Sequence, residues 1–108
     1  MAAVLAAAAA AQDWTDLSGA ELAAAFRSRT LGHETGAIQD FHASGETTLD
    51  DGRVRTGRWW IDADRLCLRW QDSPRDSCLR VRRSANGLDL SLTGRDGATT
   101  RLRYIDLN

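Results

Sequence analysis

Cys67 and Cys78 carry the most reactive side chains of this sequence, and they are its two cysteines. A thiol pair can form a redox centre, bind a metal or close a disulfide. A redox pair is usually a Cys-x-x-Cys at the start of a helix, where the helix dipole lowers a thiol pKa. Here the two cysteines lie in segments with strand-like patterns, and ten residues separate them in the sequence. We therefore expect a structural disulfide.

His33 and His42 are the candidate metal ligands or general bases. No Asp or Glu stands at a recognisable ligand spacing on the same expected strand face, and neither histidine has a nucleophile nearby in sequence. Four acidic residues lie where turns are expected and are typical of turns, not of a paired-carboxylate hydrolase: Asp50, Asp51, Asp62 and Asp64. We expect no catalytic residue, no metal site and no cofactor.

The arginines suggest a binding face. All 14 basic residues are Arg, and the strand pattern places Trp60, Arg69, Arg80 and Arg82 on one outer face, with Arg53, Arg55 and Arg58 beside them. Guanidinium groups next to an indole could bind carboxylates, phosphates or sugars of envelope polymers. In the alternative, which we favour, this is a solvated face whose arginines pair with Asp72, Asp76 and Asp89.

The stretch Leu17-Ser18-Gly19-Ala20-Glu21-Leu22 predicts the start of a helix. Ser18 is a candidate N-cap, Glu21 completes a capping box, and Leu17 and Leu22 stand at the positions of a hydrophobic staple. The apolar residues that follow keep a helical spacing until a polar stretch begins. We expect one short amphipathic helix from Ser18 to Arg29.

Beyond this helix the apolar period changes to two, and turn signals recur every eight to twelve residues. This pattern predicts a meander of antiparallel strands at about 30–34, 37–43, 46–50, 53–62, 65–70, 76–83, 88–94 and 98–105. No linker, repeat or charge block divides it. We expect a single domain over 12–108.

Two hairpins fix the strand register independently. A two-residue loop at Ala63-Asp64 places Trp60 opposite Cys67, and a connection centred on Asp72-Ser73 places Cys67 opposite Cys78, at a distance that a cross-strand disulfide can span. The same register predicts a core face made of Trp59, Ile61, Leu66, Leu68, Trp70, Leu79 and Val81. Trp60 is expected to cover the two sulfurs from the neighbouring strand.

Three further local features are expected. Asn86-Gly87 predicts a type I′ turn that places Val81 opposite Leu92. A three-residue turn with Gly97 in the left-handed conformation pairs Leu90 with Leu102. The apolar parity changes between Val54 and Trp59, which predicts a β-bulge at Gly57.

The sequence opens with an uncharged run of Met, Ala, Val and Leu over 1–11. Ala9 and Ala11 stand in the small-x-small arrangement of a signal-peptidase site, so we expect a signal-peptide remnant cleaved after Ala11. An Ala-rich helix of the mature protein is the alternative. No cysteine follows the run, which argues against a lipoprotein, and the run is too short for a membrane span.

The formal net charge of the 108 residues is −1. Such a chain lacks the basic excess of nucleic-acid-binding proteins and of proteins that bind anionic membranes. With the expected export and disulfide, the composition favours a periplasmic or secreted protein.

Three patterns together resemble an uncharacterised family of short exported bacterial β-rich proteins: the LSGAEL-type helix start, Gly57-Arg58-Trp59-Trp60-Ile61 running into Leu66-Cys67, and Trp70 followed by Cys78. The resemblance, which includes this GxWxI…LC…W…C core, covers about residues 15–105. The resemblance implies export, the disulfide and the architecture, and it implies no site residue.

We expect a mainly β fold, in which the meander of about eight strands is bent or closed into a small barrel, a lipocalin-like cup, with the N-terminal helix packed over an opening or an edge. As a function we expect a non-enzymatic, monomeric domain that binds a small ligand or an envelope partner. An enzyme acting on an envelope substrate and a passive accessory domain are the alternatives.

Overall fold

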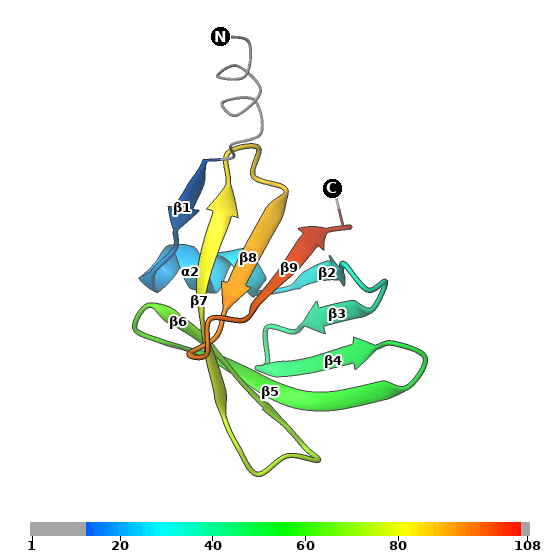
Figure 1. The fold of residues 1–108 in the computed structure, drawn as a ribbon. Helices are drawn as coiled ribbons and strands as arrows, with labels where there is room; N and C mark the ends of the chain where they lie inside the picture. The colour runs from blue at the N-terminus through cyan, green and yellow to red at the C-terminus, as the bar shows by residue number, and fades with distance from the viewer. Residues whose placement is uncertain (1–12, 107–108) are drawn as a thin grey trace, which may run out of the picture.

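The computed structural model describes residues 13–106, so the expected signal-peptide remnant at 1–11 lies outside the described residues. Within this range the chain forms nine strands and one helix (Figure 1). In chain order these are β1 (Trp14–Asp16), α2 (Gly19–Phe26), β2 (Arg29–His33), β3 (Ile38–Phe41), β4 (Glu46–Asp50), β5 (Val54–Asp62), β6 (Arg65–Trp70), β7 (Ser77–Ser84), β8 (Asp89–Thr93) and β9 (Thr99–Tyr104).

Strands β2 to β9 form a closed up-and-down barrel. Each strand pairs antiparallel with the next, and β9 pairs back with β2. Closure removes the unpaired edges that an open meander would leave. The prediction of a mainly β, eight-stranded barrel with an N-terminal helix is confirmed.

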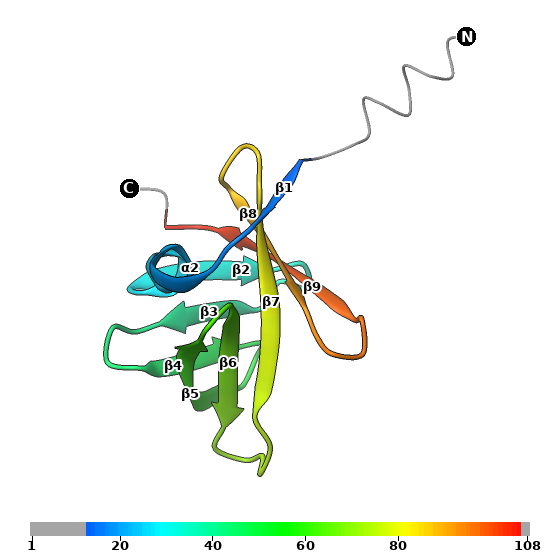
Figure 2. The same ribbon diagram turned by 90° about the vertical axis from the view of Figure 1, so that its left-hand side faces the viewer.

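Strand β1 was not predicted. It pairs with the last residues of β7, where Trp14 lies opposite Ser84, beyond the point at which β6 stops pairing with β7. Its three residues are too few to show a period of two, and they directly precede the helix. In Figure 2 β1 lies against the upper part of β7, outside the meander.

The predicted register of the central hairpins is confirmed. Trp60 lies opposite Cys67 and Cys67 lies opposite Cys78. The predicted core face points inward, and every member of it is buried or half-buried: Trp59, Ile61, Leu66, Leu68, Trp70, Leu79 and Val81.

The predicted β-bulge at Gly57 is wrong. Gly57 lies opposite Thr47 on one side and opposite Trp70 on the other, and both ladders run through it without a break. A Cβ atom at Gly57 would lie 2.5 Å from the carbonyl oxygen of Arg69 and 2.9 Å from the ring of Trp70. Glycine therefore allows β6 to approach β5 closely. The parity never changes, because Val54 faces solvent and is 68% exposed.

The two later hairpins have the predicted register, but one turn differs. Gly97 has a φ of 87° and Gly94 N–H donates to Ala98 C=O, as the three-residue turn requires. At Asn86-Gly87 only Gly87 has a positive φ, whereas a type I′ turn needs two such residues. In the turn that forms instead, Asn86 Oδ1 accepts hydrogen bonds from Ser84 Oγ and Leu88 N–H, at 2.6 and 2.9 Å.

Helix α2 ends at Phe26, three residues before the predicted end at Arg29. Arg27 is extended and Ser28 has a φ of 59°, which turns the chain into β2. Ser18 is the N-cap residue by position, but its side chain makes no capping hydrogen bond, so the predicted capping box is wrong.

The helix covers one end of the barrel, where it contacts β2 and β5 (Figure 2). Its buried face is formed by Leu22, Ala25 and Phe26. Phe26 packs on Phe41 with ring centroids 4.8 Å apart, and Phe41 packs edge-on against Trp59 at 5.8 Å. Burial of such a side chain contributes about 1.5–3 kcal/mol.

These aromatic side chains share the barrel interior with a large aliphatic cluster. Its fully buried members include Leu22, Leu31, Leu66, Leu90 and Leu102. The interior is therefore packed with side chains, and the concavities described below lie at the surface. No helix among residues 13–106 is long and apolar enough to cross a membrane.

Candidate functional site

The barrel end opposite the helix is surrounded by turns. Because β2 starts next to the helix and successive strands alternate in direction, the β2–β3, β4–β5, β6–β7 and β8–β9 turns all lie at this end. We call it the rim. Short turns that carry polar side chains on a rigid barrel are a common place for binding sites.

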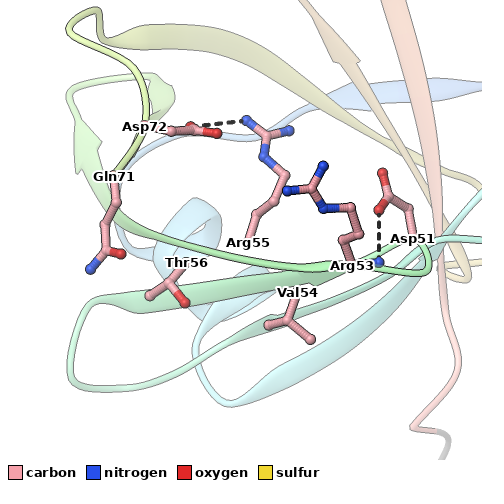
Figure 3. Close-up of a pocket in the computed structure, with 7 residues that line it drawn as sticks. All are labelled: Asp51, Arg53, Val54, Arg55, Thr56, Gln71 and Asp72. Carbon is pink, nitrogen blue, oxygen red and sulfur yellow. Dashed lines mark hydrogen bonds and ion pairs between the residues drawn. The ribbon is translucent and has the colours of Figure 1, made fainter.

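One surface hollow at the rim has a volume of about 360 Å³ (Figure 3). We call it the Arg55 hollow. Its walls come from the β4–β5 turn, the start of β5 and the β6–β7 turn, and its lining residues are Asp51, Arg53, Val54, Arg55, Thr56, Gln71 and Asp72.

The start of β5 presents two arginines on one side. Residues alternate between the two faces of a strand, so Arg53 and Arg55 point one way while Val54 and Thr56 point the other (Figure 3). The turn before them is held by Asp50 Oδ1, which accepts the Gly52 N–H at 3.0 Å. Gly52 has a φ of 108°, a conformation that glycine adopts at little cost.

Arg55 is held from two sides. Its guanidinium carbon lies 4.8 Å from the centroid of the Trp70 ring, in a cation–π arrangement. One guanidinium nitrogen lies 3.5 Å from Asp72 Oδ1. The Arg55 and Asp72 side chains are 40% and 70% exposed, and such exposed pairs contribute about 0–1 kcal/mol. The indole keeps the guanidinium plane in place while its N–H groups stay accessible.

Arg53 lies beside Arg55 and is more exposed to solvent than Arg55. It is exposed, and within residues 13–106 no carboxylate lies within ion-pair distance of its guanidinium. Its backbone N–H donates to Asp51 Oδ1 at 3.4 Å. Two guanidinium groups on one wall, with ten N–H donors between them, can bind a carboxylate or a phosphate in a bidentate manner.

The predicted binding face lies on the outside of β5, β6 and β7. Trp60 is 37% exposed there. Each of its arginines has an acidic partner: Arg69 with Asp76 at 2.7 Å, Arg80 with Asp64 at 3.8 Å and Arg82 with Asp16 at 3.0 Å. Paired arginines are what a solvated face requires, but only Asp76 is one of the three partners that we expected, and Asp64 and Asp16 are the other two observed. Ligand binding at this face stays a prediction.

Two of the expected partner carboxylates pair with other arginines. Asp72 contacts Arg55, and Asp89 contacts Arg103 at 2.8 Å. The bond to Arg103 lowers the pKa of Asp89 below its usual range. In the same way the hydrogen bonds from Arg29 lower the pKa of Asp106.

The disulfide between Cys67 and Cys78 is present, with the two Cα atoms 4.0 Å apart. Cys67 is fully buried although it lies on the outer side of β6. The bond joins the middle of β6 to the start of β7, so it fixes the hairpin that carries Trp70 and the β6–β7 turn.

The two histidines do not meet. His33 lies at the rim end of β2, and its Nε2 is 2.8 Å from Gln39 Oε1 inside the barrel. Gln39 in turn donates to Thr47 Oγ1 at 3.0 Å. His42 is exposed in the β3–β4 turn at the helix end. Among residues 13–106 no group of three His, Cys, Asp or Glu residues is placed to hold a metal.

Sequence reasoning named Arg53 and Arg55 but assigned them to the outer face. The assignment followed from the expected bulge, which would have reversed the parity before Gly57. Without a bulge, Arg55 shares the parity of Trp59 and faces Trp70. Counting in steps of two backward from Trp59 would have found this arrangement.

Comparisons of the chain with protein-family models, with curated proteins and with solved structures found no match.

Proposed function

We propose that this chain is a non-enzymatic domain of the periplasm or the secreted space, and that it binds a small ligand or an envelope partner through an anionic group. The proposed binding site is the Arg55 hollow. One observation carries the proposal: the Arg55 guanidinium is held against the Trp70 ring at 4.8 Å, next to the exposed guanidinium of Arg53.

Stacking favours binding because it reduces the entropy that a flexible arginine loses when it holds a ligand. A guanidinium that is already fixed on an indole keeps its N–H groups in the geometry that a carboxylate or phosphate requires. Arg69, Arg80 and Arg82 lack such an indole contact within the described part of the chain. This difference favours the hollow over the outer face.

The location outside the cytoplasm rests on the disulfide. Disulfides persist in oxidising compartments and are rare in the cytosol of most organisms. The run over 1–11 and the resemblance to exported bacterial proteins agree with this location. Membership of that family is part of the proposal.

The absence of catalysis is also part of the proposal. In the hollow the titratable side chains are two arginines and two aspartates, and neither histidine lines it. The His33 imidazole is engaged with Gln39 inside the barrel. The hollow therefore offers donors that can hold an anion, and its lining includes no imidazole that could act as a base near neutral pH.

The test is a titration followed by ¹H–¹⁵N NMR of the assigned Trp70 indole and the Arg53 and Arg55 Nε–H groups. The anionic probes are glucuronate and inorganic phosphate. Glucose is the control, because it is a neutral sugar of the same shape as glucuronate. We expect saturable shifts with an anionic probe and none with glucose.

Two variants locate the binding. Arg55→Gln should abolish the shifts, whereas Arg95→Gln, which removes the same charge from the exposed β8–β9 turn, should leave them unchanged. Equal loss in both variants would show that only net charge matters. If neither anion shifts any of these signals, the binding proposal fails and the passive accessory domain is favoured.

A further inference from the structure

We infer that the Asp72 carboxylate competes with the ligand for Arg55, and that the ligand of the hollow carries a single carboxylate, which takes the place of Asp72. This inference rests on the proposed function, because it names the ligand class and the control of the same site.

The contact between Arg55 and Asp72 is long compared with the Arg69–Asp76 ion pair of the same turn. Its N–O distance is 3.5 Å, while Arg69 and Asp76 are 2.7 Å apart. Charge-assisted bonds of this kind usually measure about 2.7–2.9 Å. Asp72 and Asp76 belong to the same β6–β7 turn, so the turn allows a short pair and Asp72 does not form one.

The backbone on both sides of Asp72 is held by hydrogen bonds, whereas its side chain is 70% exposed and makes one contact of 3.5 Å, to Arg55. The neighbouring Gln71 N–H donates to Thr56 C=O at 3.0 Å, and Ser73 N–H donates to Trp70 C=O at 3.1 Å. A ligand can therefore displace the Asp72 carboxylate by a side-chain rotation alone. Trp70 and Arg55 need not move, so the stacked guanidinium stays in place for the ligand.

The charges of the hollow favour one negative charge on the ligand. Its lining contains two arginines and two aspartates, Asp51 and Asp72. When Asp72 rotates into solvent, two positive charges and one negative charge remain at the wall. A single carboxylate neutralises this remainder. Inorganic phosphate carries more than one negative charge near neutral pH, and Asp51 would repel the excess.

The position that Asp72 occupies also indicates how a ligand carboxylate would approach Arg55. A planar carboxylate already faces the accessible edge of the guanidinium (Figure 3). A ligand carboxylate can approach that edge with two parallel N–H···O bonds, which the distant Asp72 does not make. The class of ligand is therefore a sugar acid, a peptide terminus or another monocarboxylate.

The test compares Asp72→Asn with Asp76→Asn, a matched variant that removes the same charge from the same turn but leaves Arg55 untouched. Glucuronate is titrated into the full chain with its disulfide intact, and binding is followed by the Arg55 Nε–H signal. We expect Asp72→Asn to bind glucuronate about two- to fivefold more tightly than the unchanged protein, the gain that loss of an exposed pair allows. Asp76→Asn should bind as the unchanged protein does.

Three results would overturn the inference in distinguishable ways. Equal glucuronate affinities in Asp72→Asn and the unchanged protein, with binding still lost in Arg55→Gln, would show that Asp72 does not compete with the ligand. The hollow would remain the binding site. Tighter binding of phosphate than of glucuronate would overturn the assignment of the ligand as a carboxylate. Failure of glucuronate and phosphate to bind either protein would overturn the proposed function itself.

Discussion

Removal of the Cys67–Cys78 disulfide should cost this domain a large share of its stability. The bond joins residues 11 positions apart. In the chain-entropy treatment, a cross-link of this length restricts the unfolded chain by about 3 kcal/mol at 25 °C. Domains of this size are stable by about 5–15 kcal/mol in total.

The variant should replace both cysteines by alanine. Cys67 is fully buried, so serine there would add a hydroxyl group to be satisfied, whereas alanine adds none. We expect the midpoint of thermal unfolding to fall by about 10–25 °C. The urea midpoint should fall by about 1–3 M. Circular dichroism and tryptophan fluorescence measure both.

Reduction of the unchanged protein provides the control, because it breaks the bond and keeps both sulfur atoms in place. Reduced protein and the double alanine variant should unfold at similar midpoints, and a reductant should not affect the variant. If oxidised and reduced protein unfold at the same midpoint, the bond does not restrict the unfolded chain and our account of this small barrel is wrong.

Three further predictions concern the ends of the barrel and β5. The Tyr104 hydroxyl donates to Ala25 C=O at 2.6 Å, and burial raises the pKa of Tyr104. Unfolding should therefore become easier as pH rises above about 10, because the tyrosine ionises first in the unfolded chain. Tyr104→Phe should remove this alkaline loss of stability in urea titrations at different pH values, and it should cost about 1 kcal/mol at neutral pH. Arg29 lowers the pKa of Asp106, so the contribution of this pair to the free energy of unfolding is present above about pH 4 and is lost as pH falls below it. Asp106→Asn should reduce the dependence of the free energy of unfolding on pH in the acid range. An unchanged slope would contradict the pairing. Gly57→Ala should destabilise the barrel by about 1–3 kcal/mol in urea unfolding, because its Cβ would lie 2.5 Å from a backbone oxygen of β6.

The meander was predictable because each hairpin carries its own register signal. Ala63-Asp64 and Gly97 define turns of known length, and a one-residue error would move buried leucines to the surface. Closure of the barrel was left open, since it depends on the pairing of β2 with β9, which are separated by most of the chain. Local turn signals contain no information on such a distant pair.

The errors have local causes. Ser18 stands at the helix start, yet the chain enters through a left-handed Gly19 with a φ of 54°, which the capping pattern does not anticipate. The expected change of parity requires Val54 to face inward because it is apolar, although a single exposed valine is ordinary on a protein surface. That one assumption produced the false bulge and turned Arg55 to the wrong face.

Gly57 connects the fold to the candidate site. Because it has no side chain, the backbone and the ring of Trp70 can lie directly against β5, and the ring edge comes within 2.9 Å of where a Cβ would stand. Two residues earlier on the same face, Arg55 lies over that ring. Alanine at 57 must push Trp70 away, so Gly57→Ala should weaken glucuronate binding as well as stability, although residue 57 does not line the hollow. Loss of stability with unchanged affinity would show that the indole does not position Arg55, and the proposed site would lose its main support.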